Sequence, residues 1–183
     1  MSENYIVPKK QDIDKVKVPE NAEFYEEMKL LLHLTRDYPD EVDLELNMPV
    51  SEEEIDEFEK KTGIILTDEL KEFFLFTNGL SLYPSALNIS TLAQIEKDLD
   101  LEWEWGDTKN YICLGDIIGD GEAIFLDLDT NTIVTNDHGE EVVFDTFAEL
   151  LVDVIFTFID GEVEDDELEE YVNDFEETES DSD

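Results

Sequence analysis

The clearest alternation of apolar and polar positions lies at residues 51–79, which read SEEEIDEFEKKTGIILTDELKEFFLFTNG. Apolar residues recur there every three or four positions, which is the spacing of one face of an α-helix. The first stripe consists of Ile55 and Phe58, and the second of Leu70, Phe73 and Phe74. The pattern predicts two short helices that turn their apolar faces toward one core.

Start and stop signals bound both of these helices. Ser51, with Glu54 three residues later, forms a capping box in which each side chain bonds the other residue's backbone N–H. Thr67 can cap the second helix. Gly63 fits the left-handed position that ends the first helix, and an Asn-Gly pair ends the second. We therefore expect a helical hairpin.

Helical spacing recurs in four other segments. A helix is expected at about 20–36, ended by Pro39, and a short one after Ser90 or Thr91. A third, capped by Asp145 or Thr146, carries apolar residues at helical spacing: Phe147, Leu150, Leu151, Val154, Ile155 and Phe158. An acidic amphipathic helix is expected at 164–175, followed by disorder in EETESDSD.

From residue 111 the apolar period changes to two. The runs YICLG, EAIFLDL, TIVTND and EVVFD are rich in Ile, Val and Phe and predict a meander of three or four antiparallel strands. Turns are expected at 129–132 and 137–140. Residues 42–48 also alternate, as an edge strand or an extended linker, and Pro49 excludes a central strand. The sum is an α+β fold with helices packed on an antiparallel or mixed sheet.

The chain length of 183 residues fits one domain with extensions, and a hydrophobic content of 41% is enough for a core. We divide the chain into an N-terminal extension with one helix (1–49), an α+β domain (50–160) and an acidic C-terminal tail that is partly helical and then disordered (161–183).

The net charge of the chain restricts the kinds of partner that it can bind. The chain has 52 acidic and 11 basic residues, a formal charge of -41, and no Lys or Arg after Lys109. Nucleic acids and anionic membranes should repel such a protein, whereas basic protein surfaces should attract it. Two plainer interpretations stay open: the acidity only keeps the protein soluble, or it marks a halophilic origin, which the excess of Lys over Arg disfavours.

No run approaches the ~18 apolar residues of a membrane span, and residues 1–17 lack the apolar stretch of a signal peptide. We therefore expect a cytoplasmic protein.

Catalytic and metal motifs are incomplete. A calcium-loop pattern that begins at Asp127 has Thr132 and His138 where Gly and Glu are needed, and neither His33 nor His138 has a ligand at metal-site spacing. The Gly-Asp-Gly at 119–121 lacks the Lys of a phosphate loop. Cys113 is expected to be a buried core thiol. We expect no enzyme, no catalytic residue, no metal and no cofactor, although a hydrolase with a hidden carboxylate pair stays open.

The run LEWEWGD is the most suggestive binding patch. In an extended segment Trp103 and Trp105 would share one face, and Trp is enriched at interface hot spots. The alternative is that one or both Trp cover the core. With the acidic residues around them and those of nearby turns, we expect a partner-binding face made of Glu102, Trp103, Glu104, Trp105, Asp107, Asp120, Glu122 and Asp137.

The order of the segments is similar to a known family. EIDEFEKKTG, IILTDELKEFFLFTNG, YICLGD, GDGEAIFLDL, TIVTNDHG and TFAELLV follow one another over about 50–155. This set resembles the SUKH superfamily, named after yeast Smi/Knr cell-wall regulators and best represented by bacterial immunity proteins. Glu59, Gly63, Phe73, Asn78-Gly79, Gly119-Asp120-Gly121, Asp127 and Asp137-His138 match its pattern. Thr67 departs from the usual Pro, although Thr also caps a helix.

The resemblance implies an α+β domain without shared catalytic residues. It also implies an intracellular immunity protein, or antitoxin, that binds and neutralises a cognate toxin, often a nuclease with a basic surface. The alternative is a non-catalytic regulatory or scaffold module of the Smi/Knr type. In either case we expect a protein partner, no nucleic acid, no membrane, and a monomer or weak dimer.

Overall fold

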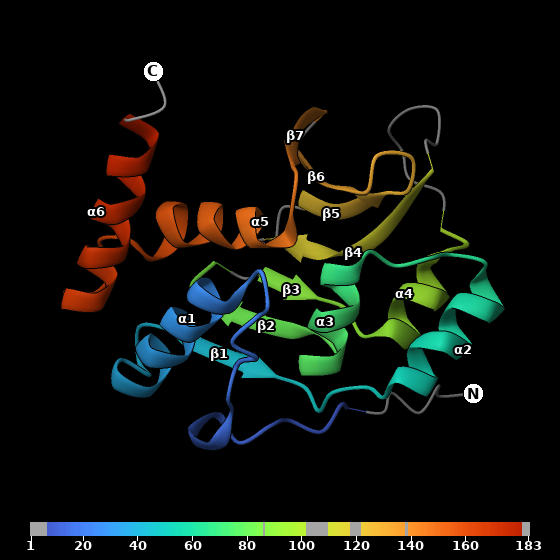
Figure 1. Cartoon of the computed structure of the whole chain (residues 1–183), viewed down its shortest axis with the longest axis horizontal. Coiled ribbons are helices and arrows are strands. Elements are labelled where there is room, and N and C mark those ends of the chain that lie inside the picture. Colours follow the sequence, from blue (N-terminus) through green and yellow to red (C-terminus); the bar gives the residue numbers. More distant parts are fainter. Residues whose placement is uncertain (1–6, 86, 102–109, 118–121, 138, 181–183) are drawn as a thin grey trace.

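The computed structural model describes residues 7–85, 87–101, 110–117, 122–137 and 139–180. Its centre is a seven-stranded antiparallel sheet in which every strand pairs with the next one along the chain, in the order β1 to β7 (Figure 1). The strands are β1 (Asp43–Leu46), β2 (Leu80–Tyr83), β3 (Leu87–Ile89), β4 (Tyr111–Ile117), β5 (Glu122–Asp127), β6 (Thr132–Asp137) and β7 (Glu140–Phe144).

Helices occupy the connections between strands and both ends of the chain. They are α1 (Tyr25–Asp37), α2 (Glu52–Thr62), α3 (Asp68–Phe76), α4 (Leu92–Asp98), α5 (Phe147–Val154) and α6 (Asp166–Ser180), with a 3₁₀ turn at Ile13–Lys15 and a π-helical turn at Ile155–Ile159. The predicted α+β fold is confirmed, and the sheet is antiparallel.

One hydrophobic core joins the helices to one face of the sheet. Its centre is aromatic: the ring of Phe73 lies 4.7 Å from that of Phe147, 5.3 Å from that of Phe74 and 6.0 Å from that of Phe24, measured between centroids. Two of these four side chains come from α3, one from α5 and one from the turn before α1, and all are fully buried. The core also includes the N-terminal helix, through buried residues such as Met28, and β1 forms the edge strand that was one of the two expectations for residues 42–48.

The helical hairpin formed by α2 and α3 is confirmed in detail. Ser51 and Glu54 form the predicted capping box, and Gly63 ends α2 at a φ of 74°. Glu59 has a role that its position in the sequence did not reveal. One of its carboxylate oxygens accepts the backbone N–H of Leu66 at 3.0 Å and lies 3.1 Å from the Lys71 ammonium. It thereby ties the turn between the two helices to both of them.

The Asn-Gly pair after α3 joins the hairpin to the sheet. The Asn78 side chain accepts the backbone N–H of Leu92, the first residue of α4, at 2.9 Å. Gly79 has a φ of 90°, and a Cβ there would collide with the backbone carbonyl of Ile89 on β3. Both residues therefore have structural roles.

These glycines allow a matched test. Gly79→Ala should destabilise the fold more than Gly63→Ala, because both positions need a left-handed backbone but only Gly79 touches another strand. We expect a loss of about 1 kcal/mol at residue 63 and of about 2–3 kcal/mol at residue 79. Urea unfolding followed by circular dichroism would measure both, and equal losses would contradict the close-approach argument.

Several elements differ from the sequence-based expectation. Helix α1 begins at Tyr25 because residues 19–24 form successive turns, with the Ala22 N–H bonded to the Pro19 carbonyl. The π-helical turn after α5 shifts the helical register, so that Ile159 is fully buried and Phe158 only partly. Helix α6 continues to Ser180, past its predicted end at 175.

Cys113 is only half-buried and lies outside the main core. It packs in a small cluster on the other face of the sheet, with Ala123, Phe125, Val134 and Tyr111. Burial raises the pKa of its thiol to about 11, so the thiol is protonated at neutral pH.

Candidate functional site

The acidic C-terminal segment is a helix that packs against the domain. Leu168 of α6 is 1% exposed and belongs to the main core. On the next turns, the rings of Tyr171 and Phe175 lie 6.4 and 5.6 Å from the ring of Phe156, which belongs to the π-helical turn after α5. The apolar stripe predicted on α6 therefore faces α5 and α1, and the acidic residues between these positions face outward.

A cap and a side-chain hydrogen bond fix the start of α6. Oδ1 of Asp165 accepts the backbone N–H groups of Glu167 and Leu168 at 3.0 and 3.1 Å. Its other oxygen lies 3.0 Å from Nε2 of His33 on α1, and the Asp165 side chain is 9% exposed. Burial alone would raise the pKa of Asp165, but the hydrogen bonds from His33 and the Leu168 backbone outweigh it and lower that pKa.

A second polar contact joins α6 to α1 farther along the helix. The Tyr171 hydroxyl donates a hydrogen bond of 2.9 Å to Oε1 of Glu27, which is only 8% exposed. Burial raises the pKa of Glu27 despite this hydrogen bond, and burial also raises the pKa of Tyr171. Together with the buried Leu168, these two polar contacts hold α6 against α1.

The buried Glu27 carboxylate gives a pH-dependent prediction. Folding raises the pKa of this carboxyl above its ordinary 4.5. The native state is therefore destabilised progressively as the pH rises past 4.5, in full above the folded pKa, and not at all below 4.5. Glu27→Gln keeps an acceptor for Tyr171 and removes the charge. We expect the variant to unfold at higher urea than the wild type at pH 7.5, and at the same urea at pH 4. A lower midpoint at pH 7.5 would contradict the assignment.

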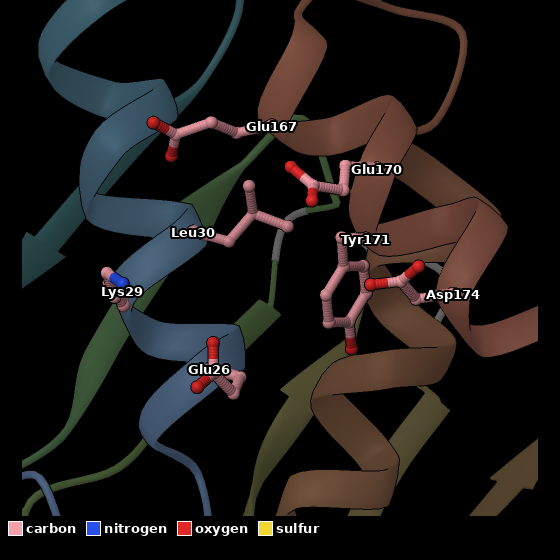
Figure 2. A pocket seen from close by; sticks show the side chains of 7 residues that line it. All are labelled: Glu26, Lys29, Leu30, Glu167, Glu170, Tyr171 and Asp174. Atoms are coloured by element: carbon pink, nitrogen blue, oxygen red, sulfur yellow. The ribbon is translucent and has the colours of Figure 1, made fainter.

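A groove of ≈ 380 Å³ runs between α1 and α6 (Figure 2). Leu30 and Tyr171 face each other across it. Its walls are otherwise charged, with four carboxylates and one ammonium: Glu26, Glu167, Glu170, Asp174 and Lys29. A groove of ≈ 350 Å³ lies on the α5 side of α6 and is lined by Glu149, Val152, Asp153, Phe156, Phe175 and Glu176. We call the seven carboxylates of these two grooves the acidic face.

Charge is unevenly distributed along the molecule. Lys60, Lys61, Lys71 and Lys97 lie on α2, α3 and α4. Lys61 pairs with Glu96, and Lys71 pairs with Glu59. Figure 1 shows α2 and α4 at one end of the molecule and α6 at the other. The α6 part of the acidic face is therefore remote from the lysines of α2 and α4, and its field should be negative.

The partner-binding residues expected from the sequence fall mostly outside the described part of the chain. This applies to Glu102, Trp103, Glu104, Trp105, Asp107 and Asp120. Glu122 begins β5 and is half-buried, and Asp137 ends β6. Since Ala123 pairs with Asn136, these two residues lie at the same end of the sheet. Whether they bind a partner stays a prediction.

The acidic face was not among these expected residues. The apolar spacing of Leu168, Tyr171 and Phe175 predicted α6 itself, but not the surface on which it packs. The groove in Figure 2 combines residues of α1 with residues of α6 more than a hundred positions later, and no local pattern connects them.

Two further features are absent from the described ranges. No group of His, Cys, Asp or Glu there could hold a metal ion. Nor does any helix in those ranges have the length and apolar character needed to cross a membrane.

The sequential antiparallel sheet, the capped hairpin packed on it and the docked terminal helix define an α+β protein of the SUKH type. Residues 49–178 match the model of the SMI1/KNR4 family (SUKH-1), which is more than half of the chain, and the protein belongs to that family. The match includes most of α6. The family consists in general of non-catalytic immunity proteins and Smi/Knr-type modules. No curated protein matches the chain.

Proposed function

We propose that this protein is an immunity protein that binds and neutralises a cognate toxin with a basic surface, and that the toxin is a nuclease. The observation that carries the proposal is the acidic face. Family membership supports the immunity role, and the acidic face supports a basic partner. The protein itself would catalyse nothing and would act in the cytoplasm, where an antidote meets its toxin.

The physical argument starts from the substrate of a nuclease. An enzyme that holds a polyanion needs Lys and Arg in its cleft, and a protein of charge -41 is attracted to that cleft from a distance. Electrostatic steering of this kind raises association rates by about 10–10³-fold. Salt weakens it, because the Debye length is ~8 Å at physiological ionic strength. Charge would set the association rate, and a few buried contacts would set the lifetime of the complex.

Aromatic anchors for those contacts come from two places. The sequence-based hypothesis assigns Trp103 and Trp105 to the interface, with the carboxylates around them. The two grooves of the acidic face add the half-buried rings of Tyr171 and Phe175 on α6. Binding by the acidic face does not require the Trp residues, so the two hypotheses are separable by substitution.

The SMI1/KNR4 match also favours a second function, a regulatory or scaffold module. Capture of partners from the native cell by the tagged full-length chain, with elution in rising salt and identification by mass spectrometry, separates the two. The immunity role predicts one basic partner that resists modest salt and whose nuclease activity falls when the protein is added back. Several partners without basic surfaces, all retained in the same salt range, would favour the scaffold.

A further inference from the structure

The groove between α5 and α6 has an aromatic floor. The rings of Phe156 and Phe175 lie 5.6 Å apart at an angle of 60°, and both side chains are half-buried. Val152 adds an aliphatic side chain one turn before Phe156. Two aromatic faces beside an aliphatic wall suit a long side chain with an apolar stem.

Three carboxylates surround this floor: Glu149, Asp153 and Glu176. The first accepts the Asp145 backbone N–H through Oε2 at 2.7 Å, which leaves its other oxygen available. The Asp153 side chain is exposed, and its partial burial raises the pKa of its carboxyl. Within the described residues, no Lys, Arg or His forms an ion pair with any of the three.

The chain places few positive charges near these carboxylates. Neither α5 nor α6 contains a Lys or Arg, because none occurs after Lys109. The groove between α1 and α6 differs on this point, since Lys29 lies on its wall and its apolar lining is Leu30 and Tyr171. Of the two, the α5/α6 groove therefore offers the more favourable site for a cation from outside.

We propose that the α5/α6 groove is an anchor site for an arginine side chain of the basic partner. Arginine fits better than lysine, because a planar guanidinium both stacks on aromatic rings and bonds carboxylates in a fork. A groove of ≈ 350 Å³ is at the small end of binding pockets, and it would hold one long side chain with its neighbours. This inference rests on the proposed function for the identity of the partner, but the site is testable without it.

The direct test is an NMR titration of the full-length chain with a blocked arginine, N-acetyl-arginine amide. We expect saturable shifts of the Phe156 and Phe175 ring signals and of the Val152 methyls. The matched probe is N-acetyl-citrulline amide, which has the same shape without the charge and should cause no such shifts. Equal shifts with both probes, or arginine shifts spread evenly over all carboxylates, would overturn the proposal.

Variants of two groove residues test whether arginine binds at this site. Asp153→Asn and Phe175→Leu should each weaken arginine binding by at least about threefold, the first by removing a carboxylate and the second a ring. Asp56→Asn on α2 makes the same charge change on an exposed residue at the other end of the molecule and should leave binding unchanged. An equal loss in Asp56→Asn would mean that the probe senses net charge only, and the site would be wrong.

The captured partner distinguishes failure of the site from failure of the proposed function. If the partner is a basic toxin, Asp153→Asn and Phe175→Leu should weaken its binding by about tenfold, and Asp56→Asn should not. A toxin bound equally by all variants would overturn the site and leave the immunity role intact. Arginine binding in the groove without any basic partner would support the site and overturn the immunity role.

Discussion

Phe73→Ala should lower the free energy of unfolding by about 3–5 kcal/mol, which is the usual cost of removing a fully buried aromatic ring. The Phe73 ring contacts Phe24, Phe74 and Phe147, so its loss leaves a cavity where α1, α3 and α5 meet. Since α1 and α5 also carry α6, the variant should loosen the acidic face as well. Urea unfolding followed by tryptophan fluorescence and circular dichroism would measure the loss.

The control for this prediction lies on the same helix. Leu75→Ala removes a side chain that is 37% exposed, and it should cost much less than Phe73→Ala. If the two variants lost similar stability, the aromatic cluster would not be the centre of the core.

Neutralising the α6 side of the acidic face should slow association with the captured partner by about tenfold at low salt. The change is Glu167→Gln, Glu170→Gln and Asp174→Asn together, three exposed residues on the wall of the groove in Figure 2. Because steering is a screened, long-range effect, the difference from the wild type should shrink as salt rises. Stopped-flow or surface-based kinetics over a salt series would measure it.

A second triple variant controls for net charge. Glu53→Gln, Asp56→Asn and Glu57→Gln change three exposed residues of α2, at the opposite end of the molecule. This variant should keep nearly the wild-type association rate. An equal loss in both triples would show that total charge, rather than the acidic face, governs association.

The motif residues of the α2–α3 hairpin and of the turn after it have structural roles in this protein. Glu59 ties α2 to the turn before α3, Gly63 ends α2, and Asn78 and Gly79 join α3 to the sheet. The resemblance therefore identifies the fold reliably. It does not identify the surface that binds the partner, because these four residues lie in the hairpin and at its junction with the sheet.

Local signals were sufficient for most elements of the fold. Caps and apolar spacing predicted α2, α3, α4 and α5, and the change to a period of two predicted the meander from β4 to β7. Local signals did not predict three features that depend on tertiary packing. These are the π-helical shift that buries Ile159, the placement of Cys113 on the other face of the sheet, and the extension of α6 to Ser180.

The candidate site was the least predictable part. A groove depends on the relative placement of two helices, and the contacts that fix α6, such as His33 with Asp165 and Glu27 with Tyr171, join residues more than a hundred positions apart. In the sequence these residues look like surface charges and a polar tail. Only their burial in the structure reveals that they hold the acidic face in place.

The central claim is that this protein neutralises a basic toxin, and the most direct measurement is the nuclease activity of the purified captured partner with increasing amounts of the full-length chain. The account predicts complete inhibition near one equivalent, with weaker inhibition by the α6 triple variant and full inhibition by the α2 triple variant. A partner with no nuclease activity, or one whose activity is unchanged by an excess of the chain, would contradict it.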